Sequence, residues 1–355
     1  MPYYKQVGVI PAKRHTQFRK PDGSLYVEEL FGAEGFSGPQ SILYHHYHPT
    51  RVKRAARLAD TRPQYVEYGG VRQRHLRAAE TPQRGDAISG RTVLLGNDDV
   101  TIAACRPVEP MTCFYRNGQA DELIFVHEGE GTLRTIFGPL DFRPGDYLVI
   151  PISTTWRMDL KGSGHRFLVV ESPSSVETPK HYRNRYGQLL EHSPFCERDF
   201  RTPTQPESHD ELGEFEVRIK VRDALHCNIL DHHPLDVVGW DGCVYPWVFN
   251  IADFEPITGR VHQPPPVHQT FEAHNFVVCS FVPRLFDYHP LAIPVPYAHS
   301  NIHSDEVLYY VRGDFMSRRG ISEGSITLHT AGLPHGPHPG LTEKSLGANE
   351  TAELA

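Results

Sequence analysis

Short apolar runs separated by glycine, proline and aspartate turns dominate two stretches of the chain. In the first stretch, about residues 91–173, the runs are 91–95, 122–126, 131–137 and 146–151. Comparable runs resume at 215–221 and continue toward the C-terminal end. Apolar segments of this length between turn residues are typical of β-strands, and 30 prolines disfavour long helices. The pattern predicts an all-β protein.

The spacing of these runs divides the sequence into four parts. Residues 1–88 mix charged and aromatic positions without clear periodicity, and we interpret them as an extension that packs on the β core. Residues 89–175 and 214–355 are the two predicted β-domains. Residues 176–213 are rich in Arg, Asp, Glu, Pro and Ser, as a connection would be.

The two β-regions resemble each other. The segment 121–129, DELIFVHEG, parallels 305–313, DEVLYYVRG, and 145–151 parallels 324–330. The offsets are nearly equal (306 − 122 = 184 and 324 − 145 = 179). Such offsets indicate a duplicated β-domain.

Two histidines and one glutamate in the second copy form a candidate metal site. His299 and Glu306 are seven residues apart, and His335 follows one hairpin later. Two imidazoles and one carboxylate leave the other coordination positions open, as in non-haem Fe(II) oxygenases. Both imidazoles must be neutral to bind, so we expect activity to fall below about pH 6. The alternative is two ordinary histidines in turns and a solvated glutamate.

The roles of the remaining histidines stay open. His303 could donate a third nitrogen or border the site, and His262 lies in a segment that could reach the mouth of the site. His329 precedes His335 by six residues, and an even spacing along a regular strand places both on one face. The N-terminal group His45, His46 and His48 is either a metal cluster or a set of aromatic packing residues.

The second copy resembles the cupin family, whose two motifs carry glycine, histidine and glutamate at fixed spacing. His299, Glu306 and Gly313 fit the first motif, with Asn301 where a second histidine would stand. Gly324, Gly332 and His335 fit the second, with Thr330 and Pro339 replacing Pro and Asn. The resemblance implies a bicupin of two jelly-roll β-sandwiches, with the ligand site in the mouth between two sheets.

The first copy keeps the cupin frame without the ligands. Glu122, Gly129, Gly145 and Pro151 are in place, but Tyr115, Asn117 and Trp156 occupy the histidine positions. Because Trp and Tyr cannot replace two imidazoles, we expect residues 89–175 to be a degenerate cupin without metal and residues 214–355 to be the metal-binding one.

The amino-acid composition limits the kinds of partner and location that we expect for this protein. The net charge of −7 argues against nucleic acid, and no run of about 18 apolar residues predicts a membrane span. The first residues lack an apolar signal core, so a cytoplasmic location is expected. The six cysteines include no C-x-x-C pair, which disfavours a zinc knuckle or a disulfide framework.

The resemblance is closer to the homogentisate 1,2-dioxygenase family. It rests on segments 26–32, 41–49, 113–118, 121–126, 297–301 and 333–337. It implies Fe(2+) held by His299, Glu306 and His335, with His262 as acid/base and His329 facing the substrate. It also implies O2-dependent opening of homogentisate to maleylacetoacetate, and a homo-oligomer (a trimer or a trimer-based hexamer).

The chain departs from this family at Phe315. The family has Arg-Gly-x-Tyr where this chain has Arg312-Gly-Asp-Phe315, so a hydroxyl that faces the substrate is missing. Asn301, His303 and Phe315 are the residues expected to border the substrate. Gentisate or a hydroquinone-type phenol therefore stays open as substrate. A bicupin isomerase or quercetinase-like enzyme with another metal also fits the ligand set, as does a metal-binding bicupin without oxygenase activity.

The chain also ends soon after His335, whereas a cupin sheet normally needs another strand to close. Either the sequence is truncated or an earlier segment completes the sheet, and an open edge would favour contacts between subunits.

Overall fold

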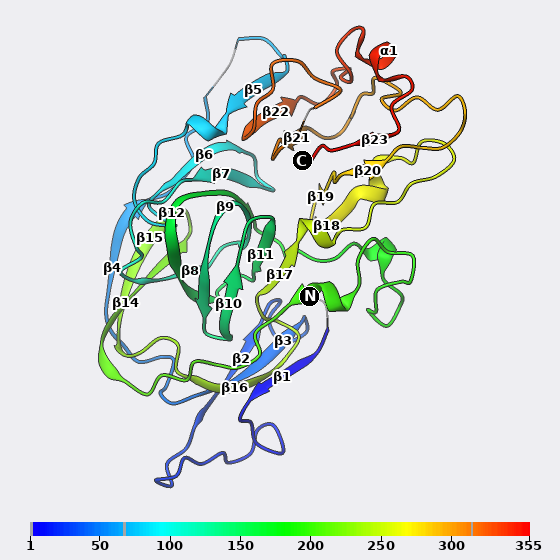
Figure 1. Cartoon of the computed structure of the whole chain (residues 1–355). Helices are drawn as coiled ribbons and strands as arrows, with labels where there is room; N and C mark the ends of the chain where they lie inside the picture. The colour runs from blue at the N-terminus through cyan, green and yellow to red at the C-terminus, as the bar shows by residue number, and fades with distance from the viewer. Residues whose placement is uncertain (1–2, 67–68, 314) are drawn as a thin grey trace. The chain divides into compact units, whose positions relative to one another are not determined.

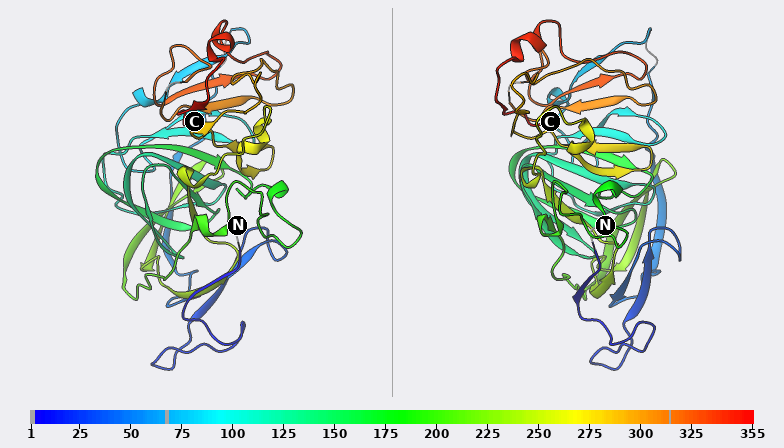
Figure 2. Two further views of the ribbon diagram at one scale, coloured as in Figure 1. Left: turned by 45° about the vertical axis from the view of Figure 1, so that its right-hand side comes forward. Right: turned by 90° about the vertical axis from the view of Figure 1, so that its right-hand side faces the viewer.

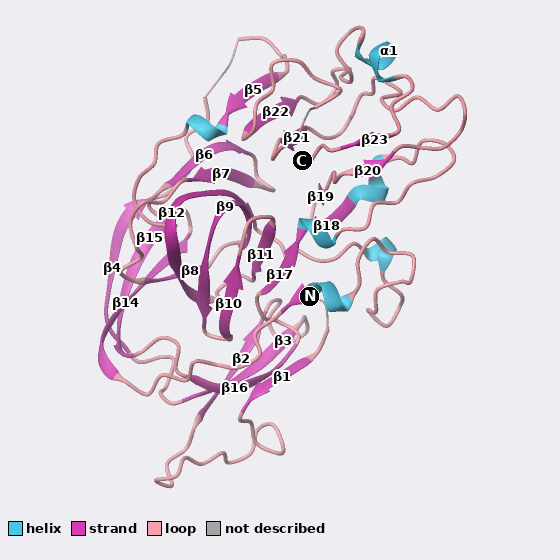
Figure 3. Ribbon diagram, viewed as in Figure 1, coloured by secondary structure: helices cyan, strands magenta, loops and turns pink. Residues whose placement is uncertain are grey.

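The computed structural model describes residues 3–66, 69–313 and 315–355, and strands dominate it (Figures 1 and 3). The α-helix α1 (Leu341–Ser345) has five residues. The remaining helical segments are short 3-10 turns: η1 (Ala78–Glu80), η2 (Lys180–Tyr182), η3 (Glu197–Asp199), η4 (Ile251–Asp253) and η5 (Pro265–His268). None of the described helices is long and apolar enough to cross a membrane. The all-β prediction is confirmed.

The chain forms two compact units. Unit 1 comprises residues 1–63, 82–250 and 272–276, and unit 2 comprises residues 64–81, 251–271 and 277–355. Strands between residues 212 and 250 group with unit 1, although they follow the polar connection. The four-part division of the sequence stays a prediction.

Unit 1 contains a long curved sheet with the strand order β13-β17-β11-β9-β12-β8-β14-β15-β4. Strand β10 pairs with β9, and β6 extends the sheet through β7, which pairs with β12. The pairs are antiparallel except β8 with β14. The bounds are β4 (Val52–Asp60), β6 (Arg91–Gly96), β7 (Thr101–Cys105), β8 (Phe114–Asn117), β9 (Asp121–Thr135), β10 (Gly138–Phe142), β11 (Asp146–Ile150), β12 (Thr155–Ser172), β13 (Phe200–Arg201), β14 (Leu212–Val221), β15 (Ala224–His232) and β17 (Trp247–Asn250).

A smaller sheet of unit 1 has the order β1-β16-β3-β2. Its strands are β1 (Lys5–Gly8), β2 (Val27–Gly32), β3 (Gln40–His45) and β16 (Val237–Gly242). Strand β16 lies between strands of the N-terminal extension, and β4 of the same extension forms the edge next to β15. The extension is therefore part of the sheets of unit 1, because its backbone completes their hydrogen bonding.

Two apolar cores fill unit 1. One surrounds Trp156, Ile124, Leu148 and Phe167 on the alternating inward positions of the long sheet. The other surrounds Trp240, whose indole N–H donates to the carbonyl of Phe137 at 2.8 Å. These cores fix the register of the strands, since a slip by one residue would expose every inward side chain.

Unit 2 is built on a small antiparallel sheet with the order β21-β22-β5, which can be followed in Figure 2. The bounds of its strands are β5 (Arg74–Arg77), β21 (Glu306–Tyr309) and β22 (Ser325–His329). Shorter pairs are β18 (Gln269–Ala273) with β19 (Phe276–Cys279), and β20 (Arg284–Leu285) with β23 (Glu350–Thr351). Strand β5 shows that a segment from before residue 88 adds a strand to the sheet that carries the C-terminal site.

The strand register agrees with the predicted duplication. In the first copy Glu122 of β9 lies opposite Ile150 of β11, and in the second copy Glu306 of β21 lies opposite His329 of β22. These four positions correspond when the two repeats are aligned by sequence. In both copies, a glutamate near the start of one strand pairs with the last residue of the neighbouring strand.

The glutamate of the first copy is buried beside a cation. The side chain of Glu122 is 1% exposed, and Arg91 Nη1 donates to its Oε1 at 2.5 Å and to Oε1 of Glu171 at 3.1 Å. Lys220 binds the other oxygen of Glu171. Tyr115 packs edge-on with Trp156, with ring centroids 5.3 Å apart. Arg91 thus neutralises the carboxylate that corresponds to the candidate metal ligand of the second copy.

Replacing Arg91 by Met should lower the free energy of unfolding by about 3–5 kcal/mol, because it leaves the buried carboxylate of Glu122 without its cation. Urea denaturation followed by intrinsic fluorescence measures this. The matched control is Arg51→Met, which breaks the exposed pair with Asp231 and should cost less than about 1 kcal/mol. Equal losses in the two variants would contradict the role of Arg91.

A second buried charge lies at the end of β3. His45 is 1% exposed, with Nδ1 at 2.7 Å from Asp236 and Nε2 at 3.0 Å from Glu29. Burial opposes the charged imidazole, but the two carboxylates outweigh burial and raise the pKa of His45 to about 9. With a carboxylate at each ring nitrogen, His45 is an imidazolium that links β3 to the segment before β16.

This raised pKa predicts a pH-dependent stability. The contribution of His45 is fully present below its ordinary value of 6.5 and is lost as the pH rises through about 9. The whole change corresponds to about 3 kcal/mol in the free energy of unfolding. Urea titrations at several pH values check this, and Asp236→Asn should flatten the dependence. A wild-type stability that is level across this window would contradict the assignment.

Candidate metal centre

Two backbone hydrogen bonds hold His299 and His335 side by side. The N–H of His299 donates to the carbonyl of His335 at 2.7 Å, and the N–H of His335 donates to the carbonyl of His299 at 2.8 Å. The ring centroids are 4.2 Å apart. Residues 36 positions apart in sequence (335 − 299 = 36) are thereby placed within reach of one ion.

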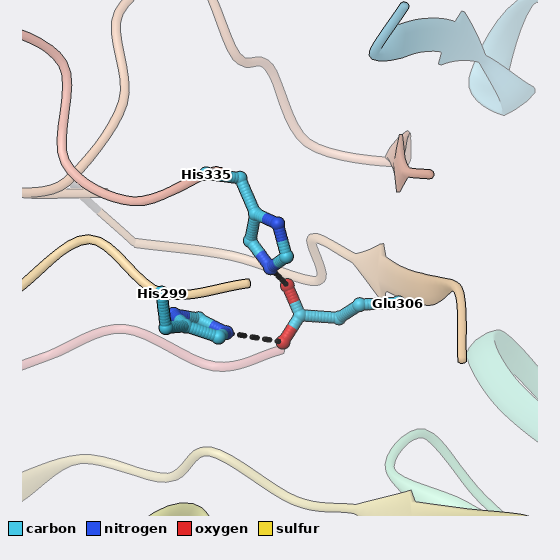
Figure 4. A group of neighbouring side chains, drawn as sticks. All are labelled: His299, Glu306 and His335. Carbon is cyan, nitrogen blue, oxygen red and sulfur yellow. Dashed lines mark ion pairs between the residues drawn. The ribbon is translucent and has the colours of Figure 1, made fainter. Parts of the chain in front are cut away.

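Glu306, the first residue of β21, points its carboxylate at both imidazoles (Figure 4). Its Oε1 lies 3.8 Å from Nε2 of His299, and its Oε2 lies 3.2 Å from Nε2 of His335. The three ligand atoms lie within 4.8 Å of one another. The three residues predicted from spacing therefore meet, and each offers a donor atom to a common point.

The tautomer of His335 indicates that this point needs a cation. Its Nδ1 lies 3.1 Å from the carbonyl of Leu333, which can only accept, so Nδ1 carries the hydrogen. Nε2 is the ring atom left to bind a metal; it is buried and has no hydrogen-bond partner, although a carboxylate oxygen is 3.2 Å away. A neutral imidazole nitrogen and a carboxylate oxygen at this distance fit a shared metal ion, and the hydrogen bond to Leu333 fixes the orientation of the ring.

Electrostatics keep the donors in their binding forms. Burial opposes ionisation of Glu306, but the hydrogen bond from His329 and the neighbouring imidazoles outweigh it and lower the pKa of Glu306. Burial, with His335 adding to it, lowers the pKa of His299. At neutral pH the site offers a carboxylate and a neutral imidazole, which suits a divalent ion.

His329 supports Glu306 from the opposite strand. Its Nδ1 lies 2.6 Å from Oε2 of Glu306, and its Nε2 lies 3.0 Å from Nη2 of Arg318. Since a guanidinium only donates, Nε2 accepts and Nδ1–H donates to the carboxylate. Arg318 also donates to the carbonyl of Gly336 at 2.7 Å. His329 thus orients the carboxylate, and Arg318 sets the tautomer of His329.

Tyr297 connects His262 to the candidate metal centre. Its Nε2 is 3.2 Å from the hydroxyl of Tyr297, and the ring of Tyr297 lies edge-on to His299 with centroids 6.1 Å apart. On its other side, Nδ1 is 3.8 Å from Oδ2 of Asp287. Burial lowers the pKa of His262, so the imidazole is neutral and can accept a proton.

The residues expected to border the substrate lie in different surroundings. His303 is exposed, and the carbonyl of Asn301 accepts the N–H of Gly332. Phe315 is buried and packs edge-on against Tyr310, with centroids 4.6 Å apart. Their contact with a substrate stays a prediction.

The N-terminal histidines go to separate partners. His45 binds two carboxylates, Nε2 of His46 lies 3.1 Å from the hydroxyl of Ser208, and Nδ1 of His48 lies 2.8 Å from the hydroxyl of Thr50. These contacts agree with packing roles rather than with a shared ion.

The sequence patterns did not single out Arg318 or Tyr297. Tyr297 could have been predicted to lie near the site, because it precedes His299 by only two residues. Arg318 had none, because a loop brings it to the site.

Two histidines and one carboxylate on a β-scaffold define this centre as a candidate mononuclear metal site. A family model, "Homogentisate 1,2-dioxygenase N-terminal", matches residues 87–251. A "Putative dioxygenase" of Saccharolobus solfataricus is 43% identical over 355 residues, covering 99% of this chain and 91% of the relative. The chain belongs to the homogentisate 1,2-dioxygenase family.

Relatives named homogentisate 1,2-dioxygenase match over a shorter range. The protein of Nitrobacter hamburgensis is 29% identical over 227 residues, covering 61% of this chain and 49% of the relative. The protein of Rhodopseudomonas palustris is 28% identical over 230 residues, with the same coverage. The matched region spans about half the length of these two relatives.

Among solved structures, a cupin 2 conserved barrel domain protein from Leptotrichia buccalis aligns with a TM-score of 0.25 and 6% identity, over 50% of this chain and 96% of that chain. A cupin protein from Bacteroides fragilis aligns with a TM-score of 0.20 and 14% identity, over 31% and 82%.

Replacing His335 by Ala should weaken Fe(II) or Co(II) binding by more than about 100-fold, since changes to groups that only support a ligand already cost about 10- to 100-fold. Anaerobic titration with metal analysis of the desalted protein measures this. The matched control is the exposed His303, whose change to Ala should leave metal binding unaltered. Equal metal content in both variants would rule out the assigned ligand set.

Proposed function

We propose that this protein is an Fe(II)-dependent dioxygenase that opens the aromatic ring of homogentisate, or of a closely related dihydroxyphenyl acid, with O2. The observation that carries the proposal is the orphaned Nε2 of His335 facing Glu306 beside His299, in a chain of the homogentisate 1,2-dioxygenase family. The donor set leaves positions free for reactants. When bound, Fe(II) would hold O2 and a ring hydroxyl and couple their electrons.

The protein's own groups prepare the site. His335 keeps its Nε2 lone pair directed inward because Nδ1–H is bound to Leu333. His329 holds the carboxylate of Glu306 in one orientation. The half-exposed side chains of His299 and Glu306 leave one side open, through which an aromatic acid and O2 could enter.

Proton transfer is the role proposed for His262. Its neutral ring can take the proton of the substrate's phenolic hydroxyl, either directly or through the hydroxyl of Tyr297 at 3.2 Å. Asp287 faces the other nitrogen and stabilises the imidazolium that this transfer creates. The proton then returns to the ring-opened product.

Phe315 favours a second candidate substrate. It is buried against Tyr310 and has no hydroxyl to offer to a polar side chain. Gentisate, whose carboxylate is attached directly to the ring, is therefore the runner-up, and hydroquinone tests whether the carboxylate is needed at all. A homo-oligomer, either a trimer or a hexamer, is part of the same proposal, by the family resemblance.

Anaerobic loading with Fe(II), followed by exposure to 18O2, tests the reaction. We expect one O2 consumed for each homogentisate, with both labelled atoms in a ring-opened product by mass spectrometry. His335→Ala should abolish oxygen uptake. Iron-loaded protein that consumes no O2 with homogentisate, gentisate or hydroquinone would refute the proposal and leave a metal-binding protein of another function.

A further inference from the structure

Arg284 of β20 is a half-buried cation without a close counterion. Among the described residues, no carboxylate oxygen lies within 4.0 Å of its guanidinium nitrogens. Its hydrogen bond to the carbonyl of Val282 is long, at 3.5 Å. Burial lowers the pKa of Arg284, and the more distant carboxylates of Glu353 and Asp287 offset burial only in part. A buried charge is costly unless it is paired, so this arginine is poised for an anion.

A small polar hollow lies against Arg284. Its volume is about 20 Å³, and its lining includes Arg284, His262, His268 and Asp287. A hollow of this size accommodates about one water-sized group, such as the oxygen end of a carboxylate. It does not accommodate a whole aromatic acid.

His268 adds a second unused polar group. It is 4% exposed and packs its ring against Phe281, with centroids 4.7 Å apart. Its Nδ1 is buried and has no hydrogen-bond partner. A buried polar atom without a partner is rare in proteins, and His268 lines the same hollow as Arg284.

Asp287 does not fill the role of counterion. Its Oδ1 accepts the N–H of Gly259 at 3.4 Å, and its Oδ2 faces Nδ1 of His262 at 3.8 Å. Its carboxylate is therefore directed at other partners. It also contributes a negative charge to the hollow, which an entering anion must overcome.

The hollow is connected to the candidate metal centre by two side chains. His262 lines it and reaches the hydroxyl of Tyr297, whose ring lies edge-on to His299. A carboxylate in the hollow would therefore lie beside His262, the residue that joins the hollow to Tyr297.

We propose that Arg284 and His268 form a carboxylate-binding subsite that anchors the acidic group of the aromatic substrate. This inference rests on the proposed function and deepens it, because it assigns the substrate's acidic side chain to residues other than Phe315. A guanidinium pairs well with a carboxylate because its planar fork matches two oxygens.

Binding to the metal-free protein tests the subsite without turnover. The probes are phenylacetate and its neutral analogue 2-phenylethanol, measured by calorimetry. Arg284→Met should weaken phenylacetate about 10- to 100-fold and leave 2-phenylethanol unchanged. The matched control is Arg77→Met, which removes an exposed arginine of the same unit and should change neither probe.

Asp287→Asn separates the subsite from an internal ion pair. If the hollow takes a carboxylate, removing the negative charge of Asp287 tightens phenylacetate. If Asp287 is instead the working counterion of Arg284, this change lowers the thermal midpoint and leaves phenylacetate no tighter, which overturns the proposal. Should Arg284→Met fail to fold, Arg284→Gln makes the same comparison, because it also removes the charge. An unchanged affinity for phenylacetate in the folded variant, or an equal loss for 2-phenylethanol, also overturns it.

Turnover distinguishes this inference from the proposed function. In iron-loaded protein, Arg284→Met should raise KM for homogentisate and leave KM for hydroquinone, which lacks a carboxylate, unchanged. Wild-type protein without oxygen uptake refutes the dioxygenase, whereas normal uptake with no shift in KM refutes the subsite alone.

Discussion

The pair of backbone hydrogen bonds between His299 and His335 is the constraint on which the candidate centre depends. It joins two loops that lie far apart in sequence, and it sets the distance between the two imidazoles. The other contacts refine this arrangement: Leu333 fixes the tautomer of His335, and His329 fixes the carboxylate of Glu306. Because the bonds are made by backbone, the scaffold holds before any ion arrives, which reduces the reorganisation that binding requires.

The two repeats compensate the charge of the corresponding glutamate in different ways. Each places a glutamate at the start of a strand, opposite the last residue of its partner. In the first repeat a guanidinium neutralises that carboxylate, and the rings of Tyr115 and Trp156 pack edge-on. In the second, imidazoles surround the carboxylate, and Nε2 of His335 is buried without a hydrogen-bond partner. A built-in cation gives stability, whereas a site that awaits an external cation can carry chemistry.

The N-terminal extension shows why two repeats need further strands. Its strands β1, β2 and β3 form a sheet with β16, β4 pairs with β15, and β5 pairs with β22 next to the candidate centre. The sheet that carries Glu306 and His329 therefore uses a strand from more than 200 residues earlier. Strand β5 thereby gives β22 a second neighbour from a much earlier part of the chain.

Local patterns in the sequence were enough to predict the strands, the duplication and the candidate ligands His299, Glu306 and His335. The reason is that alternation, turn residues and motif offsets are short-range properties of the chain. Sequence also indicated His329, although the strand expected to continue to His335 ends at His329. Only the tertiary structure decided which strands β5 and β4 pair with, and which loops bring Arg318 and Tyr297 beside the ligands. It also decided that, among the described residues, no carboxylate lies close to Arg284. These features depend on loops and long-range strand pairings, whose geometry is determined by the packing of the whole unit and leaves no periodic signal in the chain.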